Sequence, residues 1–200
     1  MATKTMRAGE KSGSSFAASE RNGEHSVSRE AIIEGLNEDL AGEHQAVMMY
    51  VHYSAMLTGP YRKELRALFQ TEVGDELGHA QFLADKIAVL GGTPTTTPRP
   101  VPPATEVRQM LENVLEAEKR AIADYMCRVK QAEAFGDLGL KVNLENQVAD
   151  ETKHKEEVER ILTGWDSLGG QTDCAARQLT EPYPRSKANH ARVGSNHRHR

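Results

Sequence analysis

The stretch Asp75-Glu76-Leu77-Gly78-His79 returns 75 positions later as Asp150-Glu151-Thr152-Lys153-His154. One Glu-x-x-His is common on helix surfaces, whereas two copies, each preceded by aspartate, indicate a repeated unit. Glu43-x-x-Ala46-Val47-x-x-Tyr50 returns at the same offset as Glu118-x-x-Ala121-Ile122-x-x-Tyr125. In each half, the lone glutamate comes 33 positions before the paired one. We interpret the pattern as an internal duplication built around a metal site.

The composition favours helices and argues against several classes of protein. Of the 200 residues, 38% are apolar and only 5% aromatic, whereas strands draw on β-branched and aromatic residues. A net charge of −4 does not suit a protein that binds nucleic acid through its whole surface. No apolar run approaches the ~18 residues that cross a bilayer, and no secretory signal is visible. With two widely spaced cysteines, we expect a cytoplasmic protein with reduced thiols and no membrane partner.

Four segments show the three-and-four spacing of apolar residues that is typical of packed helices. Gly59, Gly91-Gly92, Gly136 and Gly164 are predicted to end them. Between the second and third, residues 93–104 hold five prolines and four threonines, long enough to carry the chain across a bundle. The predicted fold is all-α, a four-helix bundle with a long crossover between helices 2 and 3. Ser28, Thr105 and Asp137 are the predicted caps of helices 1, 3 and 4.

The chain is predicted to have one folded domain between two polar ends. Residues 1–25 are almost devoid of apolar side chains and are predicted to be disordered; the bundle spans 26–165. Residues 166–200 are predicted to be polar and mostly disordered, with one short helix at 173–179. The tail is basic and holds His190, His197 and His199. DNA binding by this tail is the less favoured interpretation, and a solvated end is preferred. Cys127 is expected to be a buried thiol.

Six ionisable residues fall on the inward rows of the four predicted helices. An uncompensated charge in an apolar interior costs several kcal/mol, and four carboxylates also repel one another. Lys119, Arg120 and Lys153 are sequence neighbours of these residues and therefore point away. Two divalent cations would balance the four carboxylates. The six candidate ligands are Glu43, Glu76, His79, Glu118, Glu151 and His154.

The spacing and chemistry of these residues suit a pair of metal ions. A Glu and a His at i and i+3 share a helix face, and mixed oxygen and nitrogen ligands suit iron or manganese. Asp75 and Asp150 are predicted to accept a ring N–H from a histidine. Tyr50 and Tyr125 are either hydrogen-bond donors or radical-capable groups near the metals, or plain core residues. Glu72 and Gln147, one turn before the pairs, are predicted to support the ligands or line the bundle.

The pattern resembles the ferritin-like di-iron carboxylate proteins, in which two helices each give a Glu and two give Glu-x-x-His. The resemblance covers residues 29–165 and is closest to bacterioferritins. It implies that Glu76 and Glu151 bridge two iron ions, with manganese as the alternative metal. It also implies that Glu43 with His79, and Glu118 with His154, complete one metal each. Tyr50 matches a tyrosine that bacterioferritins carry two helical turns past their first ligand.

The resemblance implies an iron storage and detoxification protein whose ferroxidase centre oxidises Fe²⁺ with O₂ or H₂O₂. The expected assembly is a homo-oligomeric shell of 12 or 24 chains. Leu77 stands where bacterioferritins have the methionine that binds haem, so no haem is expected by that route. Thr71 stands where some of them have a histidine on the inner surface. The alternatives are a rubrerythrin-like peroxidase, a manganese catalase and a DNA-binding mini-ferritin.

Overall fold

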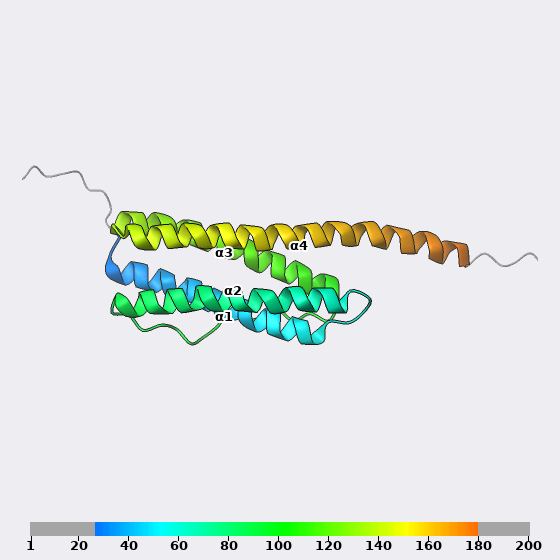
Figure 1. The fold of residues 1–200 in the computed structure, drawn as a ribbon, viewed down its shortest axis with the longest axis horizontal. Coiled ribbons are helices and arrows are strands. Elements are labelled where there is room, and N and C mark those ends of the chain that lie inside the picture. Colours follow the sequence, from blue (N-terminus) through cyan, green and yellow to red (C-terminus); the bar gives the residue numbers. More distant parts are fainter. Residues whose placement is uncertain (1–26, 180–200) are drawn as a thin grey trace, which may run out of the picture.

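Four long helices and one extended connection form the part of the chain that the structure describes, residues 27–179 of a computed structural model (Figure 1). Helices α1 and α2 form one antiparallel hairpin, α3 and α4 form a second, and α1 also packs against α3. The predicted all-α four-helix bundle with a long crossover is confirmed. The predicted N-terminal extension and the tail histidines lie outside the described residues. The helices are α1 (Arg29–Met56), α2 (Arg62–Val89), α3 (Val107–Phe135) and α4 (Leu138–Leu179).

Two of the three predicted helix caps are confirmed. The Ser28 side chain accepts a hydrogen bond from the Ala31 N–H (3.1 Å), and the Asp137 carboxylate accepts one from the Leu140 N–H (2.9 Å). Asp137 is also paired with Lys86 of α2, which lowers the pKa of the Asp137 carboxyl. The prediction for Thr105 is wrong. The cap position of α3 is one residue later, because Glu106 still has extended backbone angles, and its side chain makes no capping bond.

The predicted end of α4 at Gly164 is also wrong, since the helix continues to Leu179 and absorbs the short helix predicted at 173–179. In the described residues, positive φ angles occur only at Gly59, Gly91 and Gly136. Gly91 and Gly136 lie at the ends of α2 and α3, where a left-handed residue terminates a helix, whereas α1 ends at the extended backbone of Leu57 and Gly59 lies in the connection that follows. Gly164 stays right-handed, and glycine inside a helix costs only about 1 kcal/mol relative to alanine. As a result, α4 extends past the other helices (Figure 1).

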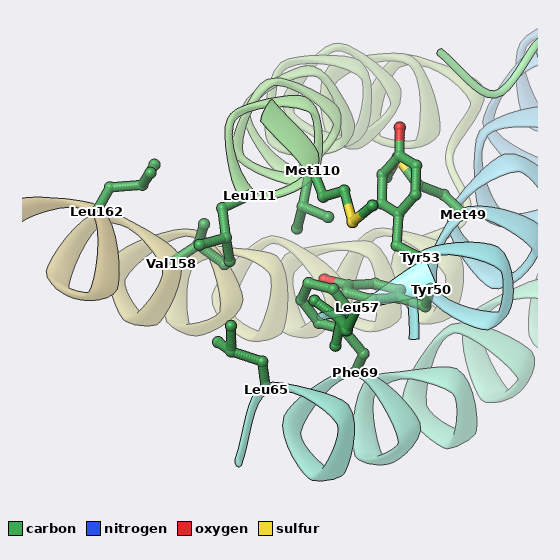
Figure 2. Packing of buried hydrophobic residues seen from close by; sticks show 11 residues of the cluster. Met49, Tyr50, Tyr53, Leu57, Leu65, Phe69, Met110, Leu111, Val158 and Leu162 are labelled. Atoms are coloured by element: carbon green, nitrogen blue, oxygen red, sulfur yellow. The ribbon is translucent and has the colours of Figure 1, made fainter. Parts of the chain in front are cut away.

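Two apolar clusters fill the bundle, one towards each end, and both draw side chains from all four helices. Figure 2 shows the first, where Tyr50 and Phe69 pack edge to face with ring centroids 5.4 Å apart. The second surrounds Leu36, Leu83 and Leu144. Each fully buried side chain of this size stabilises the fold by roughly 1.5–3 kcal/mol. On every helix the predicted polar ligands fall between the residues that enter the two clusters.

The crossover, residues 90–106, is tied to one face of α1 by hydrogen bonds. The Asn37 side chain holds it at Thr93 and Thr95, with distances of 3.2 and 2.7 Å. The Arg99 N–H donates to the carbonyl of Ala41 (2.9 Å). The side chains of Gln45 and Tyr53 donate to the carbonyls of Pro100 and Pro102. Because prolines lack an N–H, this segment depends on its carbonyls and on α1 for its attachment.

A buried ion pair between α1 and α3 was not anticipated from the sequence. Arg128 meets Asp39 through two nearly parallel contacts, Nε to Oδ2 at 2.8 Å and Nη2 to Oδ1 at 3.2 Å. Both residues are 4% exposed. Gly35 makes room for the guanidinium, because a Cβ atom there would lie 1.4 Å from Arg128 Nη1. The glycine and the ion pair are therefore one structural unit.

Substitution of Gly35 by alanine is expected to lower the free energy of unfolding by roughly 2–4 kcal/mol, because the new methyl group displaces a buried charge from its partner. Gly74→Ala is the matched control. This mid-helix glycine of α2 faces open space, so alanine there should leave stability unchanged or raise it by about 0.5–1 kcal/mol. Denaturant unfolding followed by circular dichroism measures both. Equal stability of the two variants would show that Arg128 moves aside without cost.

Candidate metal centre

The six predicted ligands converge in the layer between the two apolar clusters. α1 contributes Glu43 and α3 contributes Glu118, while α2 and α4 each contribute a Glu and a His one turn apart. The four glutamates are 1–3% exposed, and the side chains of His79 and His154 are each 11% exposed. Leucine or valine would stabilise the bundle at such positions. The helical register alone therefore places charged groups in the interior and points them at one another.

The ligand atoms form two groups that share two members. Glu43 and His79 belong to one group, and Glu118 and His154 to the other; Glu76 and Glu151 belong to both. Within each group, one ligand atom from every residue lies within 4.8 Å of the others. His79 Nδ1 is 2.9 Å from Glu151 Oε1 and 3.5 Å from Glu76 Oε2. His154 Nδ1 is 3.6 Å from Glu151 Oε2 and 3.8 Å from Glu76 Oε1. Glu76 and Glu151 are thus the central pair.

Several of these buried atoms have no hydrogen-bond partner among the described protein groups. They include Nδ1 of both histidines, both carboxylate oxygens of Glu151, and one oxygen each of Glu43 and Glu76. Even the 2.9 Å approach of His79 to Glu151 lacks the geometry of a hydrogen bond. Unpaired buried polar atoms are costly, and lone pairs that converge on one point suit metal ions. This donor set fits a pair of transition-metal ions.

Without metal, protons balance the charge of the centre. Burial alone would lower the pKa of His79 and of His154, but the surrounding carboxylates outweigh it. They raise the pKa of His79 to about 12 and that of His154 to about 10. Burial and the neighbouring carboxylates raise the pKa values of Glu76 and Glu118. Burial also opposes the ionisation of Glu151, but the two histidines lower its pKa to about 2. The two imidazolium rings therefore face one firmly ionised carboxylate.

Each of the two predicted tyrosines donates a hydrogen bond to the lone glutamate of the other half. Tyr50 on α1 donates to Glu118 on α3 (2.5 Å), and Tyr125 on α3 donates to Glu43 on α1. Both phenols are 1% exposed, and burial together with the adjacent carboxylate raises their pKa values well above the usual range. Of the predicted alternatives, the structure shows the hydrogen-bond donor. The tyrosines orient the glutamates and stay protonated.

The outer ring nitrogen of His154 meets a glutamate rather than the aspartates that the sequence favoured. Nε2 lies 3.0 Å from Glu72 Oε2 and 3.8 Å from Asp75 Oδ2. Asp150 instead accepts a bond from Lys153 (2.7 Å). The supporting role proposed for Glu72 therefore agrees with the geometry. Its counterpart in the repeat, Gln147, is 5% exposed and lines the bundle.

Cys127 and Leu77 both lie on the surface of the bundle. Cys127, expected to be buried, is exposed, because it lies beside the inward row of α3 and its neighbour Arg128 occupies the interior instead. Leu77 is 53% exposed and points away from the ligands on either side of it. Among the described helices, none is long and apolar enough to cross a membrane.

A four-helix bundle with a lone glutamate on two helices and a Glu-x-x-His on each of the other two has the architecture of di-iron carboxylate proteins. The family described as the ferritin-like domain matches residues 33–168. The chain therefore belongs to the ferritin-like family.

Curated relatives and solved structures agree with this assignment. The chain is 31% identical to the bacterioferritin of Mycobacterium bovis, over 72% of this chain and 94% of the relative. It is also 31% identical to a bacterial ferritin of Pseudomonas aeruginosa, over 60% and 77%. A ferritin-like, di-iron carboxylate protein of Bacillus anthracis is 48% identical, with a TM-score of 0.67, over 69% of this chain and 98% of that one. The Desulfovibrio desulfuricans bacterioferritin is 26% identical, with a TM-score of 0.67, over 82% and 96%.

Binding of a divalent cation at pH 7 is expected to release protons, because neutral imidazole ligates metal and the raised pKa values keep both histidines charged without it. The raised pKa values of the two histidines also contribute to the stability of the metal-free fold. That contribution is fully present below about pH 6.5 and is lost as pH rises through about 10–12. Titration of the metal-free protein with Co²⁺ in weak buffer containing a pH indicator measures the protons. Binding without proton release would show that the histidines are already neutral.

Proposed function

We propose that this protein stores and detoxifies iron, and that each chain carries a ferroxidase centre that oxidises Fe²⁺. The observation that carries the proposal is the pair of overlapping ligand groups, several of whose buried atoms have no hydrogen-bond partner among the described residues. The bacterioferritin and bacterial ferritin relatives support the storage function. Iron is then both the substrate and the stored material, with two ions held per chain. Manganese fits the same donor set.

The six side chains divide into bridging and terminal roles in this proposal. Glu76 and Glu151, which belong to both ligand groups, are assigned as bridges. Glu43 with His79, and Glu118 with His154, would each complete one ion. Two Fe²⁺ supply two electrons, which reduce O₂ with two protons to H₂O₂, or H₂O₂ with two protons to two water molecules. The protein holds both ions side by side so that one oxidant receives both electrons.

The surrounding residues set the positions of these ligands. Tyr50 and Tyr125 hold one oxygen of Glu118 and Glu43 respectively, which leaves the other oxygen free for an ion. Glu72 faces the outer nitrogen of His154 and thereby directs Nδ1 inward. The apolar clusters on both sides restrict water, so charge interactions in the layer are strong.

Glu118→Ala is expected to slow Fe²⁺ oxidation at least about tenfold while the chain stays helical, because one ion loses its terminal carboxylate. Glu116→Ala is the matched control, since Glu116 lies two residues earlier on α3 with a side chain that is 74% exposed. Stopped-flow absorbance of the ferric product measures the rate, and circular dichroism measures helicity. Equal rates for Glu118→Ala and the control would remove Glu118 from the proposed site.

A second candidate is a redox enzyme with two irons or two manganese ions that stores no mineral, such as a rubrerythrin-like peroxidase or a manganese catalase. The Bacillus anthracis protein, which is 48% identical, is described as ferritin-like and di-iron carboxylate, a description that fits this class as well as a storage protein. A DNA-binding mini-ferritin is less well supported. Such proteins usually place their ligands across a subunit interface, whereas here one chain supplies all six.

Storage predicts a shell of 12 or 24 chains that takes up far more than two irons per chain. Light scattering gives the mass of the assembly, and iron analysis after aerobic loading and gel filtration gives the ratio of metal to protein. A dimer that stops at two metals per chain would favour the redox enzyme over storage. Parallel loading with Mn²⁺ under H₂O₂ tests the manganese alternative.

A further inference from the structure

A narrow cavity leads from the metal centre towards the surface between α1 and α3. All four glutamates of the centre line its inner end, and Arg99, Arg120 and Asp124 line its outer end. Its volume is about 20 Å³, which is room for about one water molecule. The cavity therefore joins the two ligand groups to a charged site on the crossover side of the bundle.

The duplication explains why this face has a gap. Gly42 and Ala46 of α1 line the cavity, and so do Ala117 and Ala121, which occupy the corresponding positions of α3. Small side chains at both sets of positions leave space between the two helices directly above the glutamates. The outer positions, in contrast, differ between the halves. Asp124 corresponds to Met49, so its carboxylate occurs in only one half.

Arg99 closes the outer end of this gap. Its backbone is fixed to α1 through the bond from its N–H to the Ala41 carbonyl (2.9 Å). Its guanidinium lies 2.9 Å from Asp124 Oδ2 on α3, and its side chain is only 18% exposed. It also lies against Gly42, where a Cβ atom would be 3.0 Å from Nη1. The crossover thus places one arginine across both helices.

The two faces of the centre differ in how open they are. At the outer end of the cavity, Arg99 and Arg120 both approach Asp124, whose carboxylate lies 3.8 Å from Arg120. On the opposite face, a groove of about 370 Å³ between α2 and α4 reaches both histidines of the centre. Two aspartates and one lysine line this groove: Asp75, Asp150 and Lys153. On the first face a cation would meet an opening about one water molecule wide that Arg99 crosses, whereas the second face offers a wide groove.

We propose that Arg99 determines the route of the metal ion, because it closes the α1–α3 cavity to cations and leaves the α2–α4 groove as their path to the centre. The inference rests on the proposed function, in which Fe²⁺ is the ion that travels. Gly74 and Gly78 form part of the groove wall, and a Cβ atom added at either position would have no neighbour within 4 Å. Their lack of side chains keeps this path wide.

The rate of Co²⁺ binding to the metal-free protein tests the role of Arg99, because Co²⁺ absorbs visible light once it is ligated and needs no oxidation. Arg99→Ala is expected to raise the stopped-flow rate at least about fivefold, with the final spectrum and stoichiometry unchanged. Arg99→Lys, which keeps the charge, should stay near the wild-type rate. Asn37→Ala removes two hydrogen bonds of the crossover without changing its charge. An Arg99→Ala rate equal to that of wild type, or to that of a faster Asn37→Ala, would refute the proposal.

Gly74→Leu tests the other face, because its side chain would narrow the groove. This substitution should slow Co²⁺ binding in the wild-type background and slow it much less alongside Arg99→Ala, where a second path is open. Unchanged binding in the single variant would refute the assigned path. A wild-type chain that binds no Co²⁺ at the six ligands would refute the proposed function itself, whereas equal rates in all variants would refute the role of Arg99 and the assigned path but not the proposed function.

Discussion

The burial of four carboxylates and two imidazoles in one layer is the constraint on which this bundle depends. Apolar residues above and below the layer supply the packing energy that the layer itself cannot contribute. Within the layer, the charge of the histidines, the raised pKa values of Glu76 and Glu118, and the hydrogen bonds from the two phenols compensate the carboxylates. This layer contributes less packing energy than an apolar core would. It forms a candidate metal centre because metal ions can bind the buried polar atoms that have no hydrogen-bond partner.

The two halves of the duplication depend on each other at this layer. Tyr50 of the first half holds Glu118 of the second, and Tyr125 holds Glu43 in return. His79 likewise approaches Glu151, a glutamate of the opposite half. Neither hairpin contains a complete ligand group, so the centre forms only when both are packed together. The buried pair of Asp39 and Arg128 joins the same two halves through α1 and α3.

The four helices and the convergence of all six candidate ligands could be predicted from the sequence. Helical spacing fixes which side chains share a face, and the repeat fixes which faces correspond. Prediction from the sequence failed where the end of a helix depends on a backbone angle, or where the burial of a side chain depends on contacts between distant residues. Gly164 keeps a right-handed conformation that composition does not reveal. Arg128 is buried because Asp39 and Gly35 receive it, and its burial leaves Cys127 exposed. Spacing alone also could not show that Glu72, rather than Asp150, faces a histidine.

Because one chain carries both halves of the repeat, the two halves need not be identical. Arg128 corresponds to Tyr53, Asp124 to Met49, and Glu72 to Gln147, so the halves share their ligands and the two tyrosines but differ at these positions around the centre. A symmetric dimer of two identical hairpins would have to repeat every such feature on both sides. Covalent fusion removes that requirement. The second half can therefore carry Arg128, which joins α1 and α3, and Asp124, which pairs with Arg99. The first half can carry Glu72, which faces the ligand His154.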